Sequence, residues 1–324
     1  MIAKNKFTKA HQMKQAIQQL IGGGGQNKLN FPLILKLKQQ FQRFRRKKRL
    51  NSRLLHYVEK LTPPTYLTKI DIHLADHCNL NCFGCSHFSQ VAQPKFPTLQ
   101  TYEKDIKALS AITQGFIGKI QLMGGEPLLN PNCKDFFALT RKYFPNVPIW
   151  LVTNGVLLLK QNQEFWQSCR ENAIEIHPTK YPINIDWGAI QRICKEQEVV
   201  LKFFMNSDKK QKVMTKMILN PKGNSNPFYS FIGCTLNQCA QLYDGKLYPC
   251  TFTAYIEHFN KHFSQNLQIT PLDFIDIHKP NLTYQEILSF MAKPLPFCRY
   301  CDTMKWQHIG EWKTSKKDIT EYLE

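Results

Sequence analysis

Short apolar runs alternate with amphipathic stretches between residues 69 and 204. Runs with the character of strands cover residues 69–74, 119–123, 148–153, 173–177 and 199–204. The stretches between them, residues 99–112, 132–143, 163–171 and 187–197, carry the spacing of helices. Strands that alternate with helices form parallel sheets, so this segment is predicted to be an α/β fold, a partial or complete (β/α) barrel.

The pattern differs on both sides of this segment. Residues 1–66 hold two helix-like stretches, and Thr62, Pro63 and Pro64 stop the second. Beyond residue 206 turns and cysteines become frequent, and one clear helix is expected, over residues 283–291. We therefore expect a basic helical extension (1–66), a barrel core (67–205) and a small cysteine-rich module (206–324).

Positive charge is concentrated in the extension. Residues 1–66 contain 15 Lys or Arg and one acid, and therefore carry +14 of the total charge of +19. Six cations fall within residues 43–49. This stretch could meet an anionic partner such as nucleic acid, a nucleotide-linked substrate or a membrane surface, or it could be a solvated helix face docked on the body.

The eleven cysteines set the candidate chemistry. No apolar run is long enough to cross a membrane, and the first residues lack the apolar segment of a secretory signal, so we expect a cytoplasmic protein. Thiols stay reduced there, which favours metal ligation over disulfides. Cys133, Cys169 and Cys194 fall in predicted helices without partners and are expected to be core residues.

Three cysteines follow the first predicted strand directly. Cys78, Cys82 and Cys85 have the spacing C-x3-C-x2-C. Closed zinc sites use four ligands, whereas a cubane iron–sulfur cluster held by three thiolates keeps one iron open. The alternative is a zinc site in which His87 is the fourth ligand.

This triplet resembles the signature of the radical S-adenosylmethionine (SAM) superfamily. The resemblance implies a partial (β/α)6 barrel and a [4Fe-4S] cluster on Cys78, Cys82 and Cys85, with SAM on the fourth iron. A reductant such as flavodoxin or ferredoxin would drive cleavage of SAM to a 5′-deoxyadenosyl radical, which abstracts a substrate hydrogen atom. The family usually has an aromatic residue just before the third cysteine, where this chain has Gly84.

Three further segments, each at the end of a predicted strand, resemble motifs of the same family. The second predicted strand ends in Gly124, Gly125, Glu126 and Pro127, which resemble the family's GGEP loop. In that loop the glutamate accepts a hydrogen bond from the ammonium group of SAM. Thr153 and Asn154 end the third strand and could contact SAM or cap the next helix. His177 ends the fourth strand, where it is either a cosubstrate contact or a buried, satisfied histidine.

A second cysteine group lies in the carboxyl-terminal module. It resembles the SPASM module and its shorter twitch variant, which implies one auxiliary [4Fe-4S] cluster. Cys250, Cys298 and Cys301 are the expected ligands, and either Cys234 or Cys239 is the fourth, with the spacing slightly favouring Cys234. Four thiolates would also suit a structural zinc ion.

The leading hypothesis is a radical SAM enzyme that acts on an unidentified peptide, protein or sugar-type substrate held between barrel and module. The alternative is a non-catalytic zinc or iron–sulfur binding protein on the same scaffold.

Overall fold

The computed structural model describes residues 54–204, 213–237 and 239–324. The chain divides into two compact units, residues 1–55 and 56–324. The cationic stretch 43–49 and most of the predicted basic extension lie outside the described residues.

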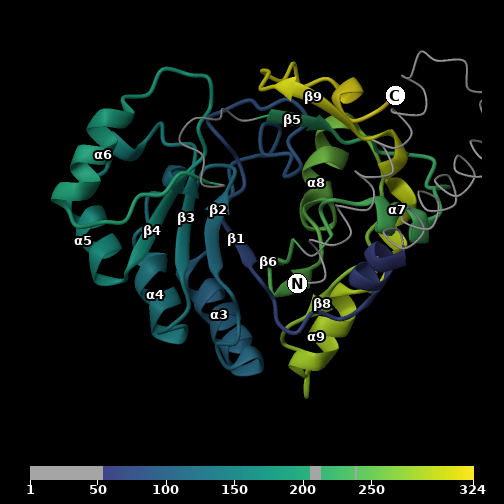
Figure 1. Cartoon of the computed structure of the whole chain (residues 1–324), viewed down its shortest axis with the longest axis horizontal. Coiled ribbons are helices and arrows are strands. Elements are labelled where there is room, and N and C mark those ends of the chain that lie inside the picture. The colour runs from purple at the N-terminus through teal and green to yellow at the C-terminus, as the bar shows by residue number, and fades with distance from the viewer. Residues whose placement is uncertain (1–53, 205–212, 238) are drawn as a thin grey trace, which may run out of the picture. The chain divides into compact units, whose positions relative to one another are not determined.

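A mostly parallel sheet of seven strands organises the second unit (Figure 1). The strand order is β4-β3-β2-β1-β6-β7-β8, so β4 and β8 are the edges of an open, partial barrel. The first four strands are parallel and in register, with Ile70 beside Ile120 and Ile120 beside Ile149. Their bounds are β1 Ile70–Ala75, β2 Ile120–Gly124, β3 Ile149–Thr153 and β4 Ile174–Pro178.

Helices follow these strands and cover their outer face (Figure 1). They are α3 Leu99–Thr113, α4 Asp135–Tyr143, α5 Gln163–Glu171 and α6 Trp187–Glu196. Three of them begin at a polar N-cap side chain, namely Thr98, Asn162 and Asp186, which accepts a backbone N–H of the first turn. Such caps satisfy donors that a helix start leaves unpaired, which explains why the predicted and observed starts agree closely.

The alternation within each strand separates an apolar face from a polar one. In β1, Ile70, Ile72 and Leu74 pack into the main core with the helices. The intervening Asp71 and His73 point to the opposite face, because successive strand side chains alternate. The interior of the partial barrel is therefore lined by polar side chains such as Asp71 and Gln121 together with apolar ones such as Met123 and Val152, which suits a binding cavity better than a closed core.

The fifth predicted strand is reduced to a single contact. Within residues 199–204 only Leu201 forms a parallel bridge, to Ile176 of β4. On the other side of β1 the sheet continues with β6 Gln241–Tyr243, which is parallel to β1, and then with antiparallel β7 Lys246–Tyr248 and β8 Ile275–Asp276. The carboxyl-terminal module thus shares the sheet of the barrel.

The expectation of a single helix beyond residue 206 is wrong. The structure has α7 Pro227–Gly233, α8 Thr251–Phe263 and α9 Tyr284–Met291. Helix α8 is rich in Thr, Phe and Tyr, which have low helix propensity, so local preference does not reveal it. Packing stabilises it instead, because Phe252, Tyr255 and Phe259 share one face and are buried in a second hydrophobic core.

The remaining elements are short. Strands β5 Val213–Lys216 and β9 Gln307–Glu311 form a separate antiparallel pair. Single 3₁₀ turns cover Pro127–Leu129, Leu158–Lys160, Pro296–Tyr300, Thr303–Lys305 and Ile319–Glu321. None of the helices in the described ranges has the length and apolar character needed to span a membrane.

Candidate active site

The three cysteines after β1 face one cavity. Cys78, Cys82 and Cys85 are each partly buried and line a cavity of about 350 Å³ at the carboxyl ends of the parallel strands. Donors point at two of the sulfurs: the backbone N–H of Leu80 lies 3.3 Å from Cys78 Sγ, and the indole Nε1 of Trp312 lies 3.2 Å from Cys82 Sγ. Burial, reinforced by the charge of Glu126 and the other two thiols, raises the pKa of Cys78. A cationic cluster would offset that penalty, so the donor set fits one.

The loops after β2 and β3 meet the cysteine loop at the same cavity. Gly124, Gly125, Thr153 and Asn154 all line it. The amide of Asn154 lies 2.7 Å from Asn79 Oδ1 and 3.8 Å from Cys78 Sγ. Three motifs that are far apart in sequence therefore form one wall.

The two glycines are required by the close approach of two backbones. A Cβ atom on Gly125 would lie 2.2 Å from the carbonyl oxygen of His77, and one on Gly124 would lie 2.1 Å from that of Ala75. Only residues without a side chain fit here.

Glu126 lies behind this wall and is hydrogen-bonded to the residues that form it. It is fully buried, does not line the cavity, and accepts hydrogen bonds from Thr153 Oγ1 (2.6 Å), Asn154 N (2.8 Å) and Leu128 N (3.2 Å). Burial raises the pKa of Glu126 to about 7, although the three hydrogen bonds act in the opposite direction. Pro127, also buried, opens the 3₁₀ turn that follows.

His177 lies apart from this wall. It is buried, stacks on Trp150 with a ring separation of 3.7 Å, and bonds Glu175 through Nε2 at 3.0 Å. It is not among the residues that line the cavity.

Four polar atoms on the cavity wall are buried without a hydrogen-bond partner among the described residues. They are Asp71 Oδ1, Ser89 Oγ, Gln90 Oε1 and Thr251 Oγ1. The other oxygen of Asp71 is satisfied by Lys69 Nζ at 2.5 Å and Gln241 Nε2 at 2.9 Å. All four atoms can accept a hydrogen bond, so they suit a ligand that brings donors.

The second cysteine group converges at the ends of helices. Cys234, Cys250, Cys298 and Cys301 line a small cavity of about 20 Å³. Cys234 directly follows α7, Cys250 directly precedes α8, and the last two lie on or next to the 3₁₀ turn Pro296–Tyr300. Burial, together with Cys234, raises the pKa of Cys298 to about 12. Cys239 instead lines the first cavity.

Neither group is drawn tightly around one ion. In the described part of the chain, no three Cys, His, Asp or Glu side chains are placed to hold a single metal ion. His87, the alternative zinc ligand, lines the first cavity, and its Nδ1 lies 2.7 Å from His73 Nε2. Cys133, Cys169 and Cys194 are buried in the main core, as expected.

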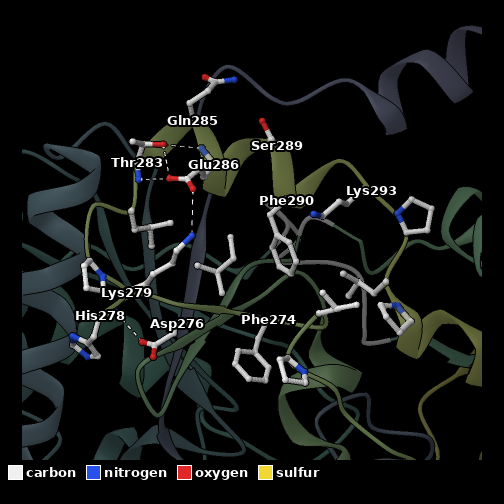
Figure 2. Close-up of a pocket in the computed structure, with 18 of the residues that line it drawn as sticks. Phe274, Asp276, His278, Lys279, Thr283, Gln285, Glu286, Ser289, Phe290 and Lys293 are labelled. Atoms are coloured by element: carbon white, nitrogen blue, oxygen red, sulfur yellow. Dashed lines mark hydrogen bonds and ion pairs between the residues drawn. The ribbon is translucent and has the colours of Figure 1, made fainter.

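A larger open groove, of about 1160 Å³, lies between α9 and residues 271–282. Figure 2 shows its wall, where the capping box of Thr283 and Glu286 starts α9. None of the predicted site residues lines it.

Sequence reasoning missed the carboxyl-terminal segment that covers the cysteine loop. Residues 312–322, here called the strap, contact residues 81–85: Phe83 N donates to Lys313 O, and Ser315 N donates to Asn81 O. Tyr181, whose hydroxyl bonds Cys82, was also missed. No local signal predicts such contacts, because the strap contacts join segments more than 200 residues apart and the Tyr181 contact joins residues 99 positions apart.

A partial parallel barrel with a cysteine-bearing cavity at the carboxyl ends of its strands defines a class of α/β barrel proteins whose site lies on the βα loops. Residues 72–186, which include the cysteine loop and the loops after β2 and β3, match the family described as the Radical SAM superfamily. The match covers about a third of the chain, and it is this part that is similar to members of that superfamily.

Relatives match over a limited region. A GTP 3′,8-cyclase of Petrotoga mobilis is 33% identical over 89 residues, or 28% of each chain. A probable GTP 3′,8-cyclase of Pyrococcus horikoshii is 32% identical over 93 residues, again 28% of each. The chain thus spans little more than a quarter of the length of these relatives.

Among solved structures, BtrN in complex with AdoMet and 2-DOIA overlaps 74% of this chain and 94% of its own, with a TM-score of 0.46 and 18% identity. Native anSMEcpe with bound AdoMet overlaps 68% and 84%, with a TM-score of 0.41 and 13% identity. Both overlaps are loose.

Proposed function

We propose that this chain is an enzyme that cleaves SAM reductively and uses the resulting radical to abstract a hydrogen atom from a polar substrate. The observation that carries the proposal is the convergence of Cys78, Cys82 and Cys85 with the loops after β2 and β3 on one cavity. When bound, a [4Fe-4S] cluster would supply one electron to break the sulfur–C5′ bond of SAM, giving methionine and a 5′-deoxyadenosyl radical.

The protein's own residues supply positioning. The three thiolates would hold three irons and leave one corner for the amino and carboxylate groups of SAM. Gly124 and Gly125 let backbone groups approach SAM closely, while Thr153 and Asn154 present polar groups from the next strand. In this proposal Glu126 acts through the residues it anchors, because its side chain faces Thr153 and the backbone of Asn154.

The second cysteine group is proposed to hold one auxiliary [4Fe-4S] cluster through Cys234, Cys250, Cys298 and Cys301. Supporting this assignment, these four thiols share a cavity that Cys239 does not line. A Cys298→Ser variant should lose about half of the roughly eight irons of the loaded protein, because that cluster loses a ligand, whereas Cys239→Ser should keep them. Equal loss in both variants would refute this ligand set.

The substrate is proposed to lie against the unpartnered acceptors of the cavity wall. Asp71 Oδ1, Gln90 Oε1 and Thr251 Oγ1 lack a hydrogen-bond donor among the described residues, and both a peptide side chain and a sugar-type alcohol can provide one. The GTP 3′,8-cyclases match only over 28% of each chain, so their substrate is not carried over. A flavodoxin- or ferredoxin-type reductant is part of the proposal.

The test is anaerobic formation of 5′-deoxyadenosine by the reconstituted protein with SAM and a reductant. Cys78→Ala, Cys82→Ala and Cys85→Ala should each abolish it. Cys133→Ala is the matched control, because this thiol lies in the main core and should be dispensable. Activity that survives loss of any of the three ligands, or protein that binds zinc and no iron, would refute the proposal.

A further inference from the structure

The strap reaches the cysteine loop through both backbone and side chains. Its backbone pairs with the loop, since Cys82 and Thr314 form an antiparallel bridge. Beside that bridge, the indole Nε1 of Trp312 lies 3.2 Å from Cys82 Sγ. The Trp312 ring also packs edge-on against Tyr181, with the ring centres 6.0 Å apart. A group from the far end of the chain thus donates to a thiol of the candidate cluster site.

Buried contacts hold the strap in place. The carboxylate of Glu321, only 3% exposed, accepts hydrogen bonds from Gly84 N (3.1 Å), Ser315 Oγ (2.9 Å) and Lys316 N (2.6 Å). Tyr322, fully buried in the second core, donates its hydroxyl to Cys85 O at 2.9 Å. These contacts anchor the strap to the cysteine loop, and the backbone next to Trp312 is thereby held beside Cys82.

An N–H group that points at a cluster-bound thiolate changes the energy of the cluster. Reduction adds negative charge to the iron–sulfur unit, and a hydrogen bond to a sulfur stabilises that added charge. The reduction potential rises as a result. Indole is suited to this task, because its N–H can only donate.

We propose that Trp312 is a positioning residue that raises the reduction potential of the SAM-binding cluster through its hydrogen bond to Cys82. This inference rests on the proposed function, because it requires a cluster on Cys78, Cys82 and Cys85. Tyr181 bonds the same sulfur, so loss of Trp312 leaves another donor in place and the effect is partial.

The test compares Trp312→Phe with Trp306→Phe in the full-length, anaerobically reconstituted protein. Phenylalanine keeps an aromatic ring and removes the N–H. Trp306 is the matched control, because its indole donates to the backbone oxygen of Ile218 at 3.1 Å and not to a sulfur. The midpoint potential is measured by redox titration of the electron paramagnetic resonance signal that changes on addition of SAM.

We expect a more negative midpoint potential in Trp312→Phe and an unchanged one in Trp306→Phe. At a fixed solution potential, each tenfold fall in the ratio of reduced to oxidised cluster corresponds to about 59 mV for a one-electron couple. Wild-type behaviour of Trp312→Phe, or an equal shift in both variants, would overturn the inference. A wild-type protein without a SAM-sensitive cluster signal would instead overturn the proposed function.

A second measurement needs no variant. In wild-type protein labelled with ¹⁵N at the indole nitrogens, pulsed electron paramagnetic resonance of the reduced, SAM-sensitive cluster should show one coupled ¹⁵N nucleus. A cluster without such coupling would contradict the hydrogen bond, even if Trp312→Phe failed to fold.

Discussion

Glu126 provides a direct test of the site, because its burial and its hydrogen bonds shift its pKa in opposite directions. The side chain is fully buried, and three donors from the loops around it bond its oxygens. Burial prevails and raises the pKa of Glu126 from its ordinary value of 4.5 to about 7. Glu126→Gln keeps the shape and removes the ionisation.

The sign of the pH dependence follows from where the proton is held more tightly. The unfolded carboxyl group loses its proton near pH 4.5, whereas the folded one keeps it until about pH 7. The resulting stabilisation is fully present below the lower value and is lost as the pH rises through the higher one. A difference of this size corresponds to about 3 kcal/mol.

The assay is the thermal unfolding midpoint of wild type and Glu126→Gln, without SAM, between pH 5 and pH 8. In a domain of this size 1 kcal/mol shifts the midpoint by about 2–4 °C, so wild type should lose roughly 6–12 °C relative to the variant over this range. Glu257→Gln, at an exposed position on α8, is the control and should follow wild type. Parallel curves for wild type and Glu126→Gln would refute the reasoning. An unfolding midpoint of wild type that rises relative to that of the variant as the pH increases would show that the three donors keep the carboxylate ionised.

Two further substitutions test packing. Gly125→Ala should cost about 1–3 kcal/mol, because its Cβ would collide with backbone atoms of His77. Gly188→Ala, in the first turn of α6, should change the stability by no more than about 1 kcal/mol, because the closest contact of its Cβ would be the side-chain oxygen of Asp186, at 3.3 Å. A normal unfolding midpoint for Gly125→Ala would contradict the close approach of the two backbones. Phe88→Ala should cost about 3–5 kcal/mol, because Phe88 is fully buried in the second core. Phe116→Ala, at a side chain that is 61% exposed, should change the stability by no more than about 0.5 kcal/mol, and similar losses in both variants would show that the second core is not as packed as described.

The barrel half of the fold was predictable because its signals are local. The helix predicted for residues 163–171 is observed as Gln163–Glu171, and the first four strands agree within one residue at each end. Alternating side chains and polar N-caps set these boundaries, and both can be read within a few residues. The fifth strand failed because one bridge at Leu201, and not a ladder, holds it.

The site was predictable in its motifs but not in its assembly. Spacing identified the three cysteines after β1 and the glycines after β2, but it could not show that Glu126 turns away from the cavity. It also left the choice between Cys234 and Cys239 open, because only the fold shows which cavity each thiol lines. Helix α8 and the strap escaped prediction for a related reason, since tertiary contacts stabilise both.

The position of the strap has a consequence for the order of events during biosynthesis. Cys85 and its hydrogen-bond partner Tyr322 are 237 residues apart in the chain. At about 5–20 residues per second, a ribosome needs on the order of ten to fifty seconds to make that stretch. During this interval the nascent cysteine loop is not covered by the strap, so its thiols are accessible until the last segment of the chain folds over them.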